Sequence, residues 1–277
     1  MKNMQSEQIQ TPANIYEQEL KYKHATAYLA NDACTIIAGP CAVEDVEQME
    51  QSAIYLKSLG VKYIRGGAFK PRTSPYSFQG LKEEGLKILS ETGAKHGLIT
   101  ISEVIDTASL SLALKYVDIV QIGERNMQNF SLLEAVGKAG IPVILKRGHA
   151  ATIEEWLLSA EYILKEGNDK IILCERGIRT FEQGMRYTLD IGAVSAVKKR
   201  TGLSIIIDPS HAAGISGYVP SLALAAVASG ADGIMVEIHP NPEEALSDGM
   251  QALNLDEFGA LYENISKVAK AIDKHLT

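Results

Sequence analysis

The chain has 277 residues, of which 46% are hydrophobic and 22% are charged, and its formal net charge at pH 7 is −7. This composition excludes a disordered chain, and the acidic balance argues against general nucleic-acid binding, which needs an excess of Lys and Arg. No apolar run reaches the ~18 residues of a membrane helix, and residues 1–19 lack the basic start and apolar core of a targeting peptide. We therefore expect a cytoplasmic protein with no nucleic-acid or membrane partner.

The first 32 residues carry little turn punctuation and only a weak apolar pattern. They are too few to build a core of their own, so they predict an N-terminal arm that packs on the main domain or on another subunit. From Thr35 the pattern changes to short β-branched runs that alternate with amphipathic helical segments. We therefore expect an arm over residues 1–32 and one domain over residues 33–277.

The alternation repeats eight times along the chain. The expected strands cover residues 35–41, 63–68, 98–104, 119–123, 142–147, 170–175, 204–208 and 233–238. The expected helices cover residues 46–59, 80–96, 107–116, 131–139, 152–165, 185–199, 221–228 and 256–274. Gly60 is expected to end the first helix, and Thr152 with Glu155 forms a capping box for the fifth.

Eight successive strand-helix units predict an α/β protein, a (β/α)8 TIM barrel with a short N-terminal extension. The structural alternative is a doubly wound open sheet. That fold usually has fewer strands and a glycine-rich phosphate turn directly after the first strand, and Gly39-Pro40-Cys41 does not have this pattern.

The carboxyl ends of the expected strands carry ionisable side chains almost without exception, whereas opposite connections such as 60–61 do not. In a barrel of this kind the active site forms at the carboxyl ends of the strands, so these residues are expected to form one ring. The ring contains Cys41, Arg65, Lys70, Arg72, Glu103, Arg125, Lys146, Arg147, His149, Glu175, Arg176, Asp208, His211, Glu237 and His239.

Six cations of this ring converge on one mouth of an acidic protein, which is costly unless anions occupy it. They are Arg65, Lys70, Arg72, Arg125, Lys146 and Arg176, enough for two phosphates or for a phosphate and a carboxylate. In the loop after the second strand, Arg72 can grip two anion oxygens while the hydroxyls of Thr73 and Ser74 donate to others. Taken alone, this loop could equally be a solvated basic loop.

A second group of the ring offers metal ligands: Cys41, His211, Glu237 and, in the loop beyond, Asp248. Strands one and eight adjoin when a barrel closes, and strand seven lies beside strand eight, so these side chains can meet. A thiolate, an imidazole and two carboxylates suit Mn²⁺, Fe²⁺, Zn²⁺ or Co²⁺. The alternative for Cys41 is a buried small apolar residue. Cys174 is assigned to barrel packing, and the odd count of three cysteines suits a reducing compartment.

Eight motifs in order resemble one enzyme family: Gly39-Pro40-Cys41, residues 65–74 (RGGAFKPRTS), 121–130 (QIGERNMQNF), 145–148 (LKRG), 175–180 (ERGIRT), 208–211 (DPSH), 236–240 (VEIHP) and 247–249 (SDG). Together they resemble 3-deoxy-D-arabino-heptulosonate 7-phosphate (DAHP) synthase, type I-beta, in its short form without a regulatory domain. The resemblance implies condensation of phosphoenolpyruvate with erythrose 4-phosphate, the first committed step of the shikimate pathway to aromatic amino acids.

The resemblance also implies a role for each matched residue. Cys41, His211, Glu237 and Asp248 match the ligands of a divalent metal ion, for which Mn²⁺ is the first expectation. Arg65, Lys70, Arg125, Lys146 and Arg176 match the phosphoenolpyruvate site, and Arg72, Thr73 and Ser74 match the grip on the aldose phosphate. Cys41, His211 and Lys70 are the catalytic candidates, Lys70 as a proton carrier with a pKa lowered by neighbouring arginines. Glu103 and Asp208 are expected near the substrates, and Glu103 or His239 positions water or supports the metal.

One position departs from the family pattern: Glu124 stands where the family has alanine. Strand alternation points Glu124 away from Arg125, so it is not expected to reach the anion and is expected to pair with a neighbouring helix. The runner-up function is the sister enzyme, 3-deoxy-D-manno-octulosonate 8-phosphate synthase, which uses arabinose 5-phosphate. That enzyme usually carries Lys-Ala-Asn-Arg-Ser where this chain has Lys70 to Ser74. A non-catalytic anion-binding barrel is the alternative from another class.

Residues 1–32 are too short for the ferredoxin-like or chorismate mutase domains that control some relatives. We therefore expect phenylalanine and tyrosine not to inhibit the isolated protein. Control by a separate partner such as a chorismate mutase stays open, and the family's habit predicts a homodimer or homotetramer.

Overall fold

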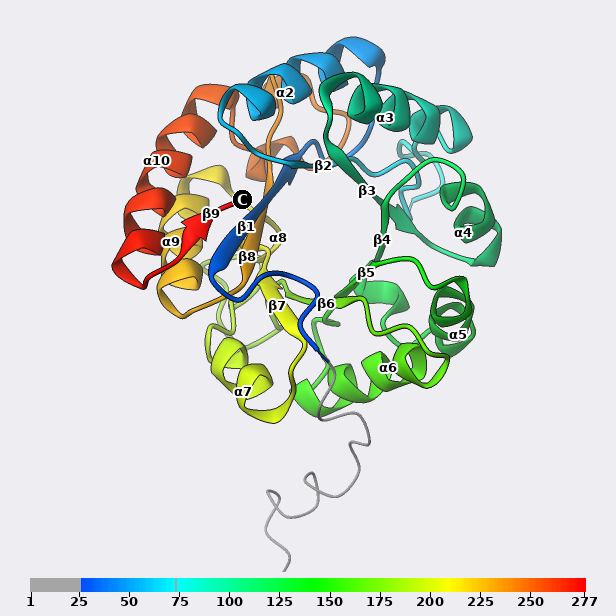
Figure 1. The fold of residues 1–277 in the computed structure, drawn as a ribbon. Helices are drawn as coiled ribbons and strands as arrows, with labels where there is room; N and C mark the ends of the chain where they lie inside the picture. Colours follow the sequence, from blue (N-terminus) through cyan, green and yellow to red (C-terminus); the bar gives the residue numbers. More distant parts are fainter. Residues whose placement is uncertain (1–25, 73) are drawn as a thin grey trace, which may run out of the picture.

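The structure is a computed structural model that describes residues 26–72 and 74–277. Most of the predicted arm therefore lies outside the described residues, and so does Thr73. Eight parallel strands pair in sequence order, and β1 pairs with both β2 and β8, which closes the barrel (Figure 1). The strands are β1 Ala33–Gly39, β2 Tyr63–Arg65, β3 Ile99–Val104, β4 Ile119–Ile122, β5 Val143–Lys146, β6 Ile171–Glu175, β7 Ser204–Ile207 and β8 Gly233–Glu237. The predicted (β/α)8 barrel is confirmed.

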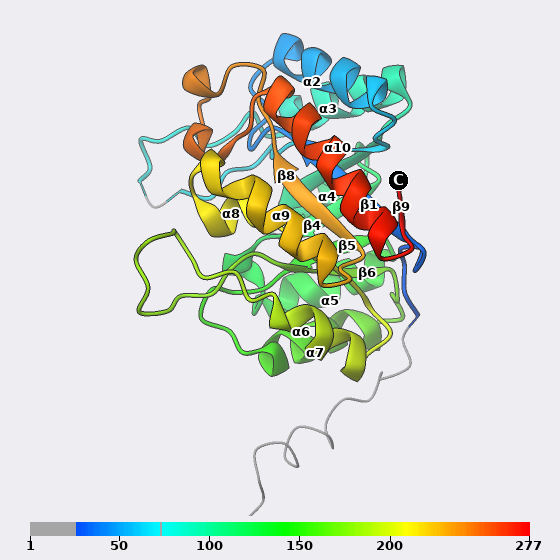
Figure 2. The same ribbon diagram turned by 90° about the vertical axis from the view of Figure 1, so that its left-hand side faces the viewer.

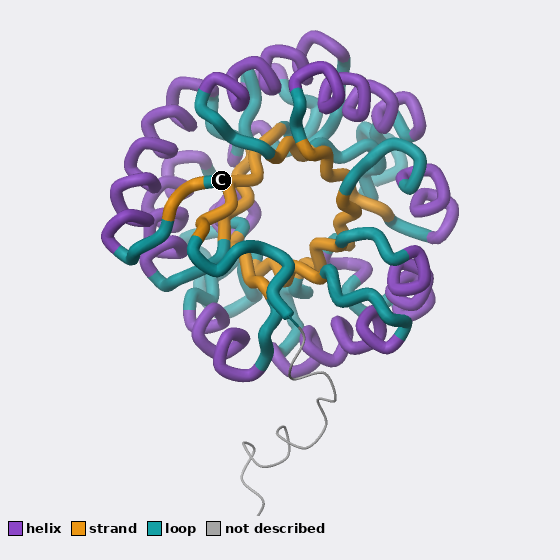
Figure 3. Tube along the Cα trace, in the orientation of Figure 1, coloured by secondary structure: helices purple, strands orange, loops and turns teal. Residues whose placement is uncertain are grey.

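Helices form an outer ring around the strands (Figure 3). They are α2 Val46–Ser58, α3 Glu83–His96, α4 Thr107–Ala113, α5 Phe130–Ala139, α6 Ile153–Lys165, α7 Gly192–Arg200, α8 Pro209–Ala213, α9 Val219–Ala228 and α10 Leu255–Ala271. Short 3₁₀ turns lie at η1 Glu124–Asn126, η2 Ser216–Tyr218, η3 Pro242–Glu244 and η4 Gly249–Gln251, and a short strand β9 His275–Leu276 follows α10. No helix in the described part of the chain is long and apolar enough to cross a membrane.

Local signals in the sequence account for several helix ends. Thr152 and Glu155 form the predicted capping box of α6, and Gly60 after α2 takes a positive φ of 79°. The prediction of a helix over residues 185–199 is wrong at its start, because α7 begins only at Gly192. The preceding loop is held by an antiparallel bridge between Ile178 and Thr188, a pairing that amphipathic periodicity does not reveal.

The inside of the barrel is filled with side chains, so one end is closed. Ile37, Ile101, Ile119, Ile144, Ile172, Cys174, Ile206 and Met235 form one buried cluster with Leu29. The packing role predicted for Cys174 is thereby confirmed. Leu29 belongs to the described end of the predicted arm, and its amide donates to Ser204 Oγ at 2.9 Å. The long loops after β2 and β6 project from the opposite side of the molecule (Figure 2). These loops follow the carboxyl ends of the strands, which carry the ionisable ring.

Gly39 ends β1 at the rim of the barrel and carries the chain toward Cys41. Its φ is +152°, and a Cβ there would lie 2.0 Å from the carbonyl oxygen of Arg65. We expect Gly39→Ala to lower the free energy of unfolding by about 3 kcal/mol, because β1 and β2 would have to separate. Gly140→Ala is the matched control, since Gly140 also has positive φ but open space around it, and about 1 kcal/mol is expected there. Equal losses in denaturant titrations of the two variants would contradict the steric argument.

Candidate active site and metal centre

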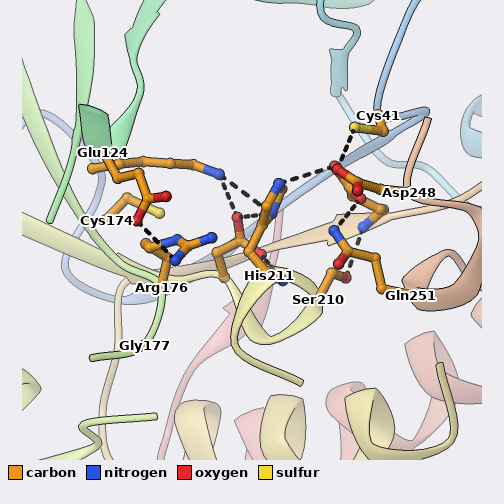
Figure 4. Close-up of polar contacts among 12 residues, drawn as sticks. Cys41, Glu124, Cys174, Arg176, Gly177, Ser210, His211, Asp248 and Gln251 are labelled. Atoms are coloured by element: carbon orange, nitrogen blue, oxygen red, sulfur yellow. Dashed lines mark hydrogen bonds and ion pairs between the residues drawn. The ribbon is translucent and has the colours of Figure 1, made fainter. Parts of the chain in front are cut away.

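Four ligand-type side chains meet at the rim where the barrel closes. Cys41 follows β1, His211 lies in α8 after β7, Glu237 ends β8, and Asp248 precedes η4. Gly39 and Glu237 are register partners of the paired strands β1 and β8, which brings the loop after β1 beside the end of β8. One ligand atom from each of the four residues lies within 4.8 Å of the others. The predicted convergence is thus present in the structure, and Figure 4 shows Cys41 and Asp248 in contact beside His211.

The chemistry of this cluster fits a divalent cation. Burial, together with the nearby Glu237 carboxylate, raises the pKa of the Cys41 thiol to about 11. Burial also opposes ionisation of Asp248, yet His211 and the Cys41 contact hold its pKa below the usual value. A divalent ion would replace the thiol proton and complete a mixed soft and hard donor set. Cys41, His211, Glu237 and Asp248 therefore fit as metal ligands.

Neighbouring side chains orient these donors. Asp208 is fully buried, and its Oδ2 lies 2.7 Å from His211 Nδ1 and 2.5 Å from Lys146 Nζ. An imidazole that donates from Nδ1 keeps Nε2 free as a ligand atom, and His211 Nε2 faces Glu237 Oε1 at 3.4 Å. Arg65 Nη1 donates to the same Glu237 oxygen at 2.8 Å. Asp208 therefore orients the His211 ring, and Arg65 orients the Glu237 carboxylate.

A cavity of about 110 Å³ opens beside the cluster. Five of the six predicted cations line it, and Arg65 is the exception, since it pairs with Glu237. His211 and Asp248 line the same cavity, so the cation-lined cavity and the cluster of four ligand-type side chains share one mouth. The complete lining consists of Lys70, Pro71, Arg72, Glu103, Gln121, Gly123, Glu124, Arg125, Lys146, Arg176, Arg186, His211 and Asp248.

Lys70 lies between the cavity and the four ligand-type side chains. Its Nζ donates to Cys41 Sγ at 2.9 Å and to the Cys41 carbonyl at 3.1 Å. Burial lowers the pKa of Lys70, but Cys41, Glu103 and Glu237 raise it, and the net pKa lies above the usual value. The prediction of a lowered pKa is therefore wrong. The prediction rested on the neighbouring arginines and left out Cys41, Glu103 and Glu237, which raise the pKa of Lys70.

The loop after β2 is only partly turned toward the cavity. Arg72 Nη2 donates to Ser247 Oγ and its Nε donates to the Phe78 carbonyl. Ser74 is exposed, is not part of the lining, and accepts a hydrogen bond from the Tyr76 amide. Arg125 donates to the Pro71 carbonyl at 2.7 Å, which ties this loop to η1.

Four other residues of the predicted ring do not line the cavity. Arg147 pairs with the buried Glu175 at 2.9 Å. His239 Nε2 lies 3.4 Å from Glu44 Oε2, and its Nδ1 accepts from the Asn241 amide at 3.0 Å. The fourth is His149, whose Nδ1 lies 3.0 Å from Glu124 Oε2.

Two charged residues of the cavity were not predicted from the sequence. Arg186 donates to Gln251 at 3.1 Å and lies 3.9 Å from Asp248, but it was expected inside a helix that begins later. Glu124 was expected to point away from the anion site, and that expectation is wrong. β4 ends at Ile122, so strand alternation does not extend to η1, and Glu124 reaches Arg176.

Comparison with known proteins identifies the family. Residues 18–274 match the DAHP synthetase I family. A phospho-2-dehydro-3-deoxyheptonate aldolase of Thermotoga maritima is 53% identical over 244 residues, which cover 88% of this chain and 72% of the relative. The chain belongs to the DAHP synthetase I family.

The chain is also similar to solved structures of a DAHP synthase and to a relative with a different name. A DAHP synthase structure from Thermotoga maritima has a TM-score of 0.87 and 51% identity over 90% of this chain and 72% of that chain. A truncated form of that synthase gives 0.84 and 48%, covering 90% and 91%. A 2-dehydro-3-deoxyphosphooctonate aldolase of Stenotrophomonas maltophilia is 31% identical over 258 residues, 87% of this chain and 92% of the relative.

Proposed function

We propose that this protein condenses phosphoenolpyruvate with erythrose 4-phosphate to give DAHP and phosphate, the first step of the shikimate pathway. The observation that carries the proposal is the shared mouth of a cation-lined cavity and a cluster of four metal-ligand side chains. Identity of 53% to a heptonate aldolase, against 31% to an octonate aldolase, favours the four-carbon aldose. The Lys70-Pro71-Arg72 sequence favours the same substrate.

The charges of the cavity suit these substrates, which together bring two phosphates and one carboxylate. Lys146, Arg176 and Arg125 would hold the phosphate and carboxylate of phosphoenolpyruvate. Arg72, with the hydroxyls of Thr73 and Ser74, would hold the aldose phosphate at the outer end. Arg72 contacts Ser247, the neighbour of Asp248, so the aldose aldehyde would lie toward the metal cluster.

The reaction uses the residues around Cys41. Cys41, His211, Glu237 and Asp248 would hold a divalent metal ion, which when bound would supply Lewis-acid polarisation of the aldehyde. We propose Mn²⁺, with Fe²⁺, Zn²⁺ and Co²⁺ as alternatives. C3 of phosphoenolpyruvate bonds to the aldehyde carbon, and the Lys70 ammonium gives a proton to the aldehyde oxygen.

The second half of the reaction releases phosphate. Water adds at C2 and returns a proton to Lys70, which restores the ammonium. The C2–O bond to phosphate then breaks, the C2 hydroxyl becomes the ketone, and its proton leaves with phosphate. Arg176 and Lys146 stabilise the negative charge that builds up on the leaving group.

A rate assay on metal-stripped protein tests the proposal. Phosphoenolpyruvate is offered with erythrose 4-phosphate or with arabinose 5-phosphate, and Mn²⁺, Fe²⁺, Zn²⁺ or Co²⁺ is added back. Metal-dependent turnover of erythrose 4-phosphate is expected. A preference for arabinose 5-phosphate would move the protein to the sister activity, and turnover of neither aldose would favour a non-catalytic anion-binding barrel.

The loop that carries Asp248 is anchored by Glu44, which contacts the chain two residues before Asp248. Glu44 Oε1 accepts from the Leu246 amide at 2.8 Å, and its Oε2 lies 3.4 Å from His239. We expect Glu44→Ala to weaken metal binding about 10-fold, because Asp248 would no longer be held in place. The check is a metal titration of stripped protein, with Glu47→Ala as the matched control. Among the described residues, Glu47 accepts a hydrogen bond only from Gln51, on the exposed side of α2, so an equal loss there would refute this role for Glu44.

The oligomeric state of the protein and the control of its activity are also proposals. We propose a homodimer or homotetramer, and control, where it occurs, through a separate partner such as a chorismate mutase. Light scattering of the purified chain tests the first, and inhibition by aromatic amino acids with and without the partner tests the second. Residues 33–277 are proposed to act as one domain.

A further inference from the structure

Glu124 places a negative charge inside a cavity otherwise dominated by cations. Its Oε2 lies 2.9 Å from Arg176 Nη1 and 3.0 Å from His149 Nδ1. Figure 4 shows the Glu124 carboxylate turned toward the Arg176 guanidinium. The distance to Arg176 is the one that a bound phosphate oxygen would have from a guanidinium nitrogen. Glu124 thus occupies a position at which an incoming anion would bind.

The local backbone explains why this side chain points inward. β4 ends at Ile122, and Gly123 leads into the tight turn η1. A Cβ at Gly123 would lie 2.1 Å from Glu103 Oε1, so the chain passes close to the cavity wall here. In a 3₁₀ turn successive side chains point about a third of a turn apart. Glu124 and Arg125 can therefore both line the cavity while contacting different partners.

Arg176 is held ready for an anion. Its side chain is 3% exposed, and its guanidinium stacks on the Tyr187 ring at 4.5 Å. Within the described residues, Nη1 has the ion pair with Glu124 but no hydrogen bond of good geometry. A buried guanidinium nitrogen that lacks a well-formed hydrogen bond favours a ligand that can supply one. Glu124 therefore balances the charge of Arg176 but leaves Nη1 without a well-formed hydrogen bond.

Glu124 is ionised at neutral pH. Burial raises its pKa, but Arg176 and His149 outweigh burial and hold the pKa below the usual value. A phosphate at Arg176 would meet this carboxylate at short range, and like charges repel strongly in a partly buried site. His149 offers the carboxylate a second partner. It is stacked on Tyr187 with 5.6 Å between the ring centroids, and its side chain is 29% exposed.

We propose that Glu124 is a built-in competing anion, which weakens binding of phosphate-bearing substrate and of released phosphate at Arg176. This rests on the proposed function of the cavity. When phosphate binds, the Glu124 carboxylate gives up Arg176 and keeps His149. When phosphate leaves, Glu124 neutralises Arg176 again. Glu124 therefore limits affinity for phosphoenolpyruvate and for the inorganic phosphate product, without taking part in bond making.

Calorimetric titration of the metal-loaded protein with inorganic phosphate and with phosphoenolpyruvate tests this inference. Glu124→Ala is expected to tighten phosphate binding about tenfold, the size expected when one close like charge is removed. Glu124→Gln, which keeps the size but not the charge, is expected to tighten it as well. His149→Ala is expected to weaken phosphate binding, since Arg176 is then the remaining partner of the Glu124 carboxylate. Glu134→Ala, on the outer helix α5, is the charge-matched control and should change nothing.

Steady-state kinetics provide the second readout. In Glu124→Ala the KM for phosphoenolpyruvate should fall together with its dissociation constant, while the KM for erythrose 4-phosphate stays within twofold. Weaker phosphate binding in Glu124→Ala would overturn the inference and make Glu124 a positioning residue for Arg176. An unchanged dissociation constant would overturn it too. If the wild type turns over and Glu124→Ala has the same phosphate affinity as the wild type, only this inference is refuted. If the wild type binds neither phosphate nor phosphoenolpyruvate, the proposed function is refuted as well.

Discussion

Replacing Cys41 with alanine is expected to lower kcat/KM by about 1000-fold or more, even at saturating metal. The thiol lies within 4.8 Å of the other three ligand atoms, and it is the soft donor of the set. Loss of one of the four proposed ligands would lower affinity for the ion and disturb its placement beside the aldehyde. Polarisation of a carbonyl by a metal contributes several kcal/mol to catalysis. A thousandfold loss corresponds to about 4 kcal/mol of transition-state stabilisation.

Two measurements separate loss of the ligand from loss of the fold. Metal content after dialysis should fall in Cys41→Ala, while its circular dichroism and thermal midpoint should stay close to those of the wild type. Cys34→Ala is the matched control, because Cys34 is equally buried but packs in the main hydrophobic core away from the ligand cluster. If Cys41→Ala keeps more than a tenth of the wild-type activity with metal bound, Cys41 is not a ligand.

Replacing Lys70 with methionine is expected to lower kcat by about 10² to 10⁴-fold, the usual contribution of a positioned proton carrier. The Lys70 ammonium is buried, 2.9 Å from Cys41 Sγ, at the boundary between the cation-lined cavity and the metal cluster. Because this position is buried, a proton donor from the solvent cannot replace the Lys70 ammonium. The effect should fall on kcat more than on KM, because the proton moves only during bond making.

Lys70→Arg distinguishes proton transfer from charge alone. Arginine keeps the positive charge but does not release its proton in proteins. Both variants should therefore be slow if Lys70 carries a proton. Recovery of most of the activity in Lys70→Arg would mean that Lys70 acts only by its charge. Metal affinity should stay within tenfold of the wild type in both, and a larger loss would show that Lys70 mainly supports Cys41.

The fold could be predicted from the sequence because its signals are local. Alternation of apolar runs with amphipathic segments reports burial of each element separately, and the capping box at Thr152 marks a helix start within four residues. The same reasoning failed at residues 185–191. That stretch has helical periodicity, but the bridge from Ile178 to Thr188 and the contact of Arg186 with Gln251 keep it in a loop.

The members of the candidate site could also be predicted, because a barrel places the ends of its strands at one rim whatever the details of packing. That rule brings Cys41, His211 and Glu237 together before any distance is known. It does not say which way each side chain turns. Arg65 was expected at the anion site but pairs with Glu237, and Ser74 is exposed. Rotamers depend on neighbours from other strands, which a linear pattern does not contain.

The sequence by itself determined the barrel, the order of its units, the ring of ionisable residues at one rim and the resemblance to the DAHP synthases. Tertiary structure alone decided the electrostatics within that ring. The raised pKa of Lys70 and the contact of Glu124 with Arg176 both depend on groups far apart in the chain. Coulomb energies change steeply with distances of a few ångströms, and folding sets those distances while composition does not.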